Sequence, residues 1–169
     1  MPQTFVDGSL FSADVREFLG LLHKNNVDYM IVGGEAVIYY GYARLTGDID
    51  FFYNRENENA LKLFSALDEF WDKNIPGIKN YLELLENGLI LQFGRPPHRI
   101  DIINCIDGVS FEEAKSSKLT VLMKIKEDHT PIYYIGLNEL IKNKEASARP
   151  KDIDDLAYLR KARNNPSSS

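Results

Sequence analysis

The chain has 169 residues, of which 44% are hydrophobic and 27% are charged, and its formal net charge is −5. This length and hydrophobic content suit a single domain with one substantial core, which we place at residues 1–163. The acidic total disfavours broad, sequence-independent nucleic-acid binding, because such binding neutralises many phosphates with lysine and arginine. The one cysteine, Cys105, excludes an internal disulfide, and its apolar neighbours favour a buried, inert thiol.

Targeting and membrane signals are missing from the sequence. The N-terminal residues do not combine a charged segment with an apolar core, and no run of 18 apolar residues occurs. We therefore expect neither secretion nor membrane insertion, and a cytoplasmic location is favoured. The chain has no internal repeat and no linker that would divide it. The polar segment 164–169 is predicted to be a disordered tail.

The first third of the chain predicts a helix, a strand and a second helix. Segment 12–24 opens with a serine suited to cap a helix and carries apolar residues at helical spacing. Tyr29–Val32 is a short apolar run that predicts a buried strand. Gly33 and Gly34 then predict a turn before a helix that starts near Glu35. Such a turn can admit a phosphate at the helix N-terminus, although a tight turn without a ligand is the plainer alternative.

Two aspartates, Asp48 and Asp50, flank Ile49 at the start of a predicted strand over residues 49–53. On a strand, residues i and i+2 share a face, about 6.6 Å apart along the chain. Both carboxylates can then hold the same metal ion or ion pair, while Ile49 faces the buried side. Aspartates also occur beside strands as turn-forming residues, so the pair alone does not establish a metal site.

The rest of the chain alternates helical and strand patterns. Predicted helices cover residues 56–72, 75–87, 137–146 and 151–162, and predicted strands cover residues 89–93, 99–103, 119–125 and 131–135. The last two strands flank a polar turn around Asp128, which predicts a hairpin. Pro150 precedes the final helix, where proline is favoured.

The motif over residues 32–51 resembles the signature of the nucleotidyltransferase superfamily of DNA polymerase β-like fold. That signature is a hydrophobic residue, two glycines or Gly-Ser, a helix, and then alternating aspartates and hydrophobic residues. The similarity looks closest to small bacterial AbiEii-type nucleotidyltransferase toxins, which share stretches like 41–50 and 140–156. It covers about residues 27–160. The resemblance implies an α+β fold, with a mixed β-sheet flanked by helices and further helices at the C-terminus.

The superfamily uses a third carboxylate on a later strand, and Asp101 lies between apolar neighbours where that residue would fall. The resemblance therefore implies that Asp48, Asp50 and Asp101 are the catalytic residues and hold two Mg²⁺ ions. The residues expected to bind the nucleotide are Gly33, Gly34, Arg44, Thr46, Lys144 and Arg149. Asp152, in the same C-terminal pattern, would orient Lys144 or Arg149 through a salt bridge.

The implied activity is Mg²⁺-dependent transfer of a nucleoside monophosphate from a nucleoside triphosphate, such as ATP, to an acceptor hydroxyl. Asp101 would complete the metal site and help to deprotonate the acceptor. Arg44 and Thr46 directly precede the acidic pair and can reach the phosphates, although a loop arginine is usually only solvated. The resemblance also implies a role as the toxin of a bacterial toxin–antitoxin pair, with a cognate antitoxin as a partner.

The acceptor stays open among RNA, protein and small molecules. A drug-like acceptor calls for acidic or aromatic walls, for which Glu35, Tyr42 and Glu83 are candidates. Glu35 directly follows the glycines, where a carboxylate would repel a triphosphate if it pointed inward, so it contacts the acceptor or points away. Residues 142–163 carry seven basic and four acidic side chains. Such a patch can hold a triphosphate or an RNA end, or it can be a solvated helical surface.

Two other classes of protein compete with the transferase interpretation. One is a non-catalytic nucleotide- or partner-binding module of the same fold. The other is a structural α+β protein in which the motif is a coincidence. The three carboxylates argue against the first, because like charges repel when no metal offsets them. The second would require the glycine turn, the acidic pair, the later carboxylate and the C-terminal basic helix all to coincide.

Overall fold

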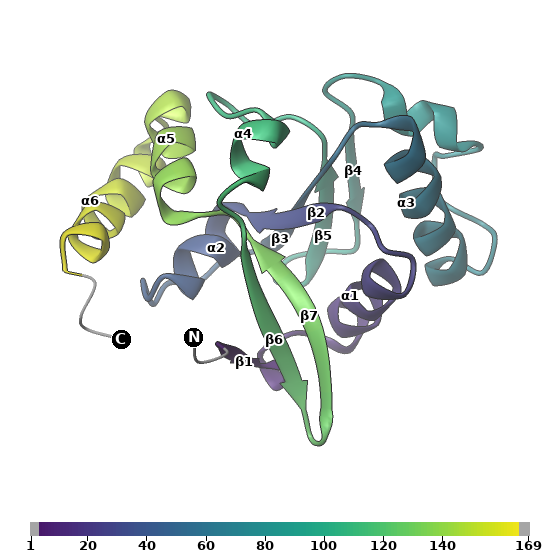
Figure 1. Cartoon of the computed structure of the whole chain (residues 1–169), viewed down its shortest axis with the longest axis horizontal. Helices are drawn as coiled ribbons and strands as arrows, with labels where there is room; N and C mark the ends of the chain where they lie inside the picture. The colour runs from purple at the N-terminus through teal and green to yellow at the C-terminus, as the bar shows by residue number, and fades with distance from the viewer. Residues whose placement is uncertain (1–3, 166–169) are drawn as a thin grey trace.

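The amphipathic and alternating patterns of the chain assemble into one seven-stranded mixed sheet with helices around it (Figure 1), in a computed structural model that describes residues 4–165. The strands are β1 (Phe5–Asp7), β2 (Tyr29–Val32), β3 (Asp48–Tyr53), β4 (Ile90–Phe93), β5 (Arg99–Ile103), β6 (Leu119–Ile125) and β7 (Asp128–Tyr134). The helices are α1 (Ala13–Lys24), α2 (Gly33–Tyr39), α3 (Asn57–Phe70), α4 (Phe111–Lys115), α5 (Leu137–Ser147) and α6 (Pro150–Asn164). The expected α+β class is confirmed.

The strand order is β1-β6-β7-β2-β3-β5-β4, so the strand with the paired aspartates lies inside the sheet. Helices α1 and α3 pack together on one side, and α5 and α6 gather at the opposite end of the molecule (Figure 1). Helix α1 begins as predicted, because the Ser12 hydroxyl accepts a hydrogen bond from the Val15 amide at 3.2 Å.

The two faces of β3 have different surroundings, as the alternation of its side chains requires. On one face, Phe51 packs edge-on against Phe18 of α1, with ring centroids 5.1 Å apart. On the other face, Phe52 packs against Phe111 of α4 at the same centroid distance. Asp48 and Asp50 share the second face with Phe52. Helix α1 and the core therefore cover the apolar side, and the carboxylates point away from it.

Strand pairing brings distant residues into register at this point. Strand β3 runs parallel to β5, with Asp50 beside Asp101 and Asp48 beside Arg99. It runs antiparallel to β2, with Val32 opposite Asp50. The chain leaves β2 at Val32, so the glycine turn lies directly against the acidic pair.

Gly33 is required by both its conformation and its neighbour. Its φ is +65°, in the left-handed region that favours glycine, and a Cβ added there would overlap the Asp50 carboxylate. Helix α2 begins at Gly33, two residues earlier than the predicted start near Glu35. The glycine thus has a packing role beside Asp50 whether or not a phosphate binds.

Several other predictions needed correction. Strand β1 and helix α4 were not predicted, because three- and five-residue elements carry too few residues for a periodic pattern. The helix predicted over residues 75–87 is wrong in extent, because the helical part of this segment is a 3-10 helix at Tyr81–Leu85. The hairpin of β6 and β7 is present, but it turns at residues 126–127 and Asp128 already pairs with Ile125.

Two predictions about single segments also changed. Cys105 is exposed, so its predicted burial was wrong. Strand β5 ends two residues before it, and its thiol donates a hydrogen bond to Asn87 Oδ1 at 2.8 Å. Helix α6 continues through Asn164, one residue past the predicted end of the domain. Residues 166–169 of the predicted tail lie outside the described residues. Among the described helices, none has the length and apolar content needed to cross a membrane.

Candidate metal centre

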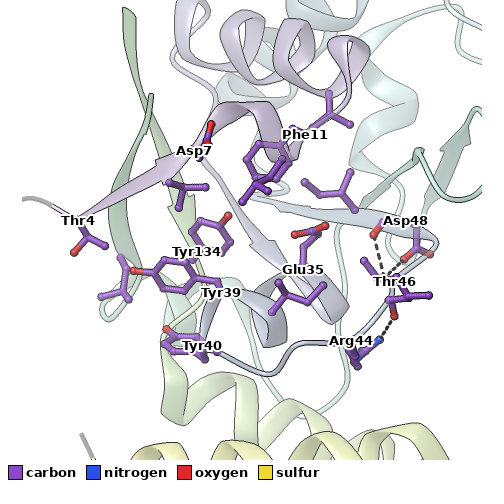
Figure 2. Close-up of a pocket in the computed structure, with 18 of the residues that line it drawn as sticks. Thr4, Asp7, Phe11, Glu35, Tyr39, Tyr40, Arg44, Thr46, Asp48 and Tyr134 are labelled. Atoms are coloured by element: carbon purple, nitrogen blue, oxygen red, sulfur yellow. Dashed lines mark hydrogen bonds between the residues drawn. The ribbon is translucent and has the colours of Figure 1, made fainter. Parts of the chain in front are cut away.

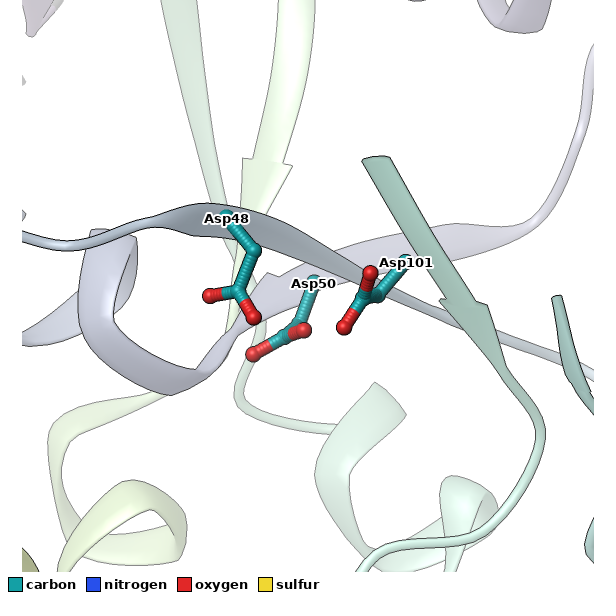
Figure 3. A group of neighbouring side chains, drawn as sticks. All are labelled: Asp48, Asp50 and Asp101. Carbon is teal, nitrogen blue, oxygen red and sulfur yellow. The ribbon is translucent and has the colours of Figure 1, made fainter. Parts of the chain in front are cut away.

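Three aspartate side chains from two strands meet at one place on the sheet (Figure 3). Asp48 and Asp50 project from one face of β3, and Asp101 projects from β5 beside Asp50. One carboxylate oxygen from each residue lies within 4.8 Å of the others. The structure thus brings together the three carboxylates that the resemblance implied, from positions about 50 residues apart.

The three residues could hold a metal ion, and their chemistry favours a hard one. Three carboxylates offer only oxygen ligands, which Mg²⁺, Mn²⁺ and Ca²⁺ prefer. Within the described residues the group contains no histidine or cysteine. The donor set does not select one of these cations over the others.

The crowding of the three carboxylates changes the pKa of Asp50. Burial, together with the charges of Asp48 and Asp101, raises the pKa of Asp50 to about 7, against about 4 for an ordinary aspartate. The nearby charge of Lys151 opposes this shift. A divalent cation favours ionised carboxylates, so its binding would relieve the repulsion.

Arg99 is the residue at this site to which we assigned no role from the sequence. Its Nε donates to Asp101 Oδ1 at 2.8 Å, and its Nη2 lies 3.0 Å from Asp101 Oδ2 and 2.7 Å from Asp48 Oδ2. The placement follows from strand geometry, because Arg99 and Asp101 are two residues apart on β5 and Arg99 pairs with Asp48 on β3. The arginine two positions before Asp101 on a predicted strand was a usable signal. Its guanidinium offsets part of the negative charge.

Thr46 supports Asp48 from the preceding loop, and Gly34 of α2 lies beside Thr46. The Thr46 hydroxyl donates to the main-chain oxygen of Asp48 at 3.2 Å and lies 3.4 Å from its carboxylate. A Cβ on Gly34 would come within 2.6 Å of this hydroxyl, so the glycine leaves room for it. Thr46 therefore contacts Asp48, Gly33 lies against Asp50, and Gly34 lies against Thr46. Their binding of a nucleotide stays a prediction.

The other predicted nucleotide-binding side chains belong to an ion network whose centre, Lys144 with Asp152 and Asp155, is buried, whereas Arg149 at its edge is exposed. Asp155 accepts a hydrogen bond from Arg44 Nη2 at 3.0 Å, and its carboxylate lies 2.9 Å from Arg44 Nε and 3.1 Å from Lys144 Nζ as ion pairs. Lys144 also donates to Asp152 at 2.9 Å, and Asp152 accepts from Arg149 Nε at 2.8 Å. The Lys144 side chain is only 2% exposed. The expected orientation of Lys144 and Arg149 by Asp152 is confirmed, and part of the basic segment 142–163 is internal.

The charges in this network are well compensated. Burial disfavours the ionised form of Asp152, but hydrogen bonds from Arg149 and Lys144 outweigh it and lower the pKa of Asp152 to about 2. The network joins the loop before β3 to helices α5 and α6. It therefore fixes the C-terminal helices relative to the strand that carries the acidic pair.

The start of helix α6 also presents positive charge to the acidic cluster. Hydrogen bonding to Asp152 raises the pKa of Arg149, and the charge of Asp50 raises it further. Lys151, which is exposed, acts electrostatically on Asp50 in return. Lys151 was not among the predicted site residues.

A cavity of about 1220 Å³ opens beside Asp48 (Figure 2). Strand β1, helices α1, α2 and α6, and the loop before β3 contribute to its walls. Glu35 and Asp48 both line it. Of the other candidates for an acceptor wall, Tyr42 and Glu83 are not among the described lining residues.

Comparison of the chain with protein-family models and with curated protein sequences found no match. The geometry of the site and the motif resemblance therefore carry the functional argument.

Replacing Gly33 with alanine should weaken divalent-cation binding, because the new Cβ displaces the Asp50 carboxylate. We expect about a tenfold loss of Mn²⁺ affinity in calorimetric titration. Gly77→Ala is the matched control, since Gly77 also has a positive φ of 77° but nothing lies within 4 Å of the Cβ that an alanine would add there. Both variants should lose about 1 kcal/mol of stability from the backbone. Equal Mn²⁺ affinity in both variants would contradict the placement of Asp50.

Arg99→Gln should strengthen Mn²⁺ binding by about three- to tenfold, because a cation that competes for Asp48 and Asp101 is removed. The same variant should be less stable than the natural protein when no metal is added. Arg95→Gln, which changes an exposed arginine in the loop before β5, serves as the control. Weaker metal binding in Arg99→Gln would show that the guanidinium holds the carboxylates in place rather than competing for them.

Lys144→Met should destabilise the protein by about 3–5 kcal/mol in chemical denaturation, because it leaves Asp152 and Asp155 buried with less compensation. Lys142→Met, on the same helix, removes a surface ion pair with Glu113 and should cost about 1 kcal/mol or less. Similar losses in the two variants would mean that the buried network contributes little.

Proposed function

We propose that this protein is a Mg²⁺-dependent nucleotidyltransferase that moves a nucleoside monophosphate from a nucleoside triphosphate to an acceptor hydroxyl. The observation that carries the proposal is the meeting of Asp48, Asp50 and Asp101 on adjacent parallel strands. The basic start of α6, with Arg149 and Lys151 acting on Asp50, supports it. Positioning and charge neutralisation supply most of the catalysis in such reactions, and this arrangement offers both.

In this proposal each group of residues has a defined task. Asp48, Asp50 and Asp101 hold the metal, and Arg149 and Lys151 face the negative charge of the triphosphate. Bound Mg²⁺ would neutralise the phosphates and lower the pKa of the acceptor hydroxyl. The acceptor oxygen forms a bond to the α-phosphorus while the bond from that phosphorus to the β-bridging oxygen breaks. Pyrophosphate leaves with the electron pair, and Asp101 takes the hydroxyl proton.

The biological part of the proposal rests on the motif resemblance. It is the role of toxin in a bacterial toxin–antitoxin pair, in the cytoplasm, with an antitoxin as partner. The acceptor is considered in the next subsection.

A specific observation keeps the non-catalytic module as the second candidate. Converging carboxylates were expected to need a metal, but the single positive charge of Arg99 is already shared between two of the three, Asp48 and Asp101. A module that binds nucleotides or partners without turnover could therefore retain the same aspartates. Nucleotide binding does not distinguish the two candidates, because both can bind a nucleotide. Transfer of a labelled nucleotide to an acceptor does distinguish them.

The first test is calorimetric titration of ATP, GTP, CTP and UTP with and without Mg²⁺. We expect Mg²⁺-dependent binding of at least one nucleotide, weakened about tenfold or more in Asp50→Asn because an acidic ligand is lost. Asp128→Asn, in the exposed start of β7, should bind like the natural protein. Failure of every nucleotide to bind would refute the proposal.

Catalysis is then tested with the nucleotide that binds, labelled at its α-phosphate. Incubation with total RNA, with the protein itself and with organic alcohols should move the label to one of them and release pyrophosphate. Binding with no transfer to any of these would favour the non-catalytic module.

A further inference from the structure

The cavity lies on one side of the acidic cluster, next to Asp48. Of the three aspartates, Asp48 is the one found among its described lining residues, and neither Arg149 nor Lys151 is found there. The positive charges suited to a triphosphate thus lie on the Asp50 side of the cluster. The cavity lies on the Asp48 side, and at about 1220 Å³ it has room for a drug-sized molecule.

The mouth of the cavity is unusually apolar. Eight large hydrophobic side chains are exposed on the described surface, and four of them line this cavity: Phe5, Leu10, Leu45 and Leu119. Leu45 is 96% exposed and Leu10 is 78% exposed. Large apolar side chains gathered at a cavity mouth are typical of a binding site, since their exposure to water is unfavourable. These side chains favour an occupant with an apolar body.

Aromatic side chains continue the apolar surface inward (Figure 2). The rings of Tyr39 and Tyr134 stack with centroids 4.2 Å apart, and both residues line the cavity. The Tyr40 hydroxyl is already bonded to the Ile135 carbonyl at 2.7 Å, which leaves its ring for the cavity wall. Rings of this kind bind flat apolar groups and organic cations.

Glu35 adds a negative charge to these apolar walls. Figure 2 shows its side chain between the tyrosines and the Asp48–Thr46 segment. Within residues 4–165 its carboxylate has no hydrogen bond or ion pair within bonding distance, and burial raises its pKa. Arg44, the nearest cation to influence it, is held by Asp155 at 2.9 and 3.0 Å. A half-buried carboxylate without such a partner favours a cationic ligand.

The other charged groups that line the cavity do not compensate Glu35. Asp7 accepts from the Ser9 amide at 2.9 Å, and Asp48 is paired with Arg99. Lys161 is exposed on α6 at the cavity edge, and His98 belongs to the exposed loop before β5. The interior end near Glu35 is therefore the negative end.

We propose that this cavity binds the acceptor, and that the acceptor is a small organic cation with an apolar or aromatic body. Its ammonium group lies against Glu35, and its apolar body contacts the tyrosines and the leucines at the mouth. Its hydroxyl group is directed past Asp48 into the carboxylate cluster, where Asp101 would take its proton. The name acceptor rests on the proposed transferase function, whereas the binding of an organic cation does not.

The test uses three indole probes of similar size in calorimetric titration, with no metal or nucleotide, at a pH near 8, which favours the ionised form of the Glu35 carboxyl. Tryptamine is cationic, tryptophol is neutral and indole-3-propionate is anionic. We expect tryptamine to bind about tenfold more tightly than tryptophol, and indole-3-propionate to bind most weakly. Equal binding of the three probes, or tightest binding of the anion, would overturn the proposal.

Variants of two cavity residues, Glu35 and Leu45, test whether the preference for tryptamine arises in this cavity. Glu35→Gln should remove the advantage of tryptamine over tryptophol, whereas Glu127→Gln, in the exposed turn between β6 and β7, should retain it. Leu45→Lys, at a site too exposed to affect folding, should weaken tryptamine more than tryptophol. A tryptamine preference that survives Glu35→Gln would place the cation elsewhere and overturn the proposal.

Competition with the nucleotide separates this proposal from the preceding one. Simultaneous binding of tryptamine and the Mg²⁺–nucleotide complex supports an acceptor site beside the metal centre. Displacement of tryptamine by the nucleotide would make the cavity a base-binding site and overturn the acceptor assignment. Tryptamine binding that depends on Glu35, in a protein that binds no nucleotide, would leave the cation site standing and remove the transferase function.

Discussion

Electrostatic repulsion among three carboxylates, whose oxygens lie within 4.8 Å of one another, is the constraint around which this structure is arranged. Strand pairing imposes the crowding, since Asp50 and Asp101 are neighbours in a parallel register. Arg99 offsets Asp48 and Asp101 at hydrogen-bond distance, and Asp50 is left with a raised pKa. The cluster could therefore hold a metal ion, because added positive charge lowers its free energy.

The C-terminal helices are tied to this centre by a second set of charges. Lys144 and Asp152 are almost fully buried, and Asp155 links them to Arg44 in the loop before β3. The ion network places the start of α6 near Asp50, so that two further positive side chains act on the cluster. The basic segment 142–163 therefore has two parts. One part is internal and structural, and the other part is exposed and faces the carboxylates.

Asp48 lies at the boundary between this charged region and the apolar cavity. On one side of it are the other two carboxylates and the basic end of α6, which suit phosphate groups and cations. On the other side are tyrosine rings, exposed leucines and the carboxylate of Glu35, which suit an organic cation. One region suits a metal ion with phosphate groups and the other suits an organic cation with an apolar body, and this difference favours two ligands that meet at Asp48.

The sequence by itself determined most of the longer regular elements and the acidic pair, because alternation and helical spacing are local properties: β2, β5, β6 and α1 follow their patterns closely. It also indicated Asp101 through the motif resemblance. Tertiary structure alone decided that Arg99 contacts the carboxylates, that Lys144 is buried between Asp152 and Asp155, and that Glu35 faces a cavity. These facts depend on strand register and helix packing between residues far apart in the chain, which no local pattern encodes.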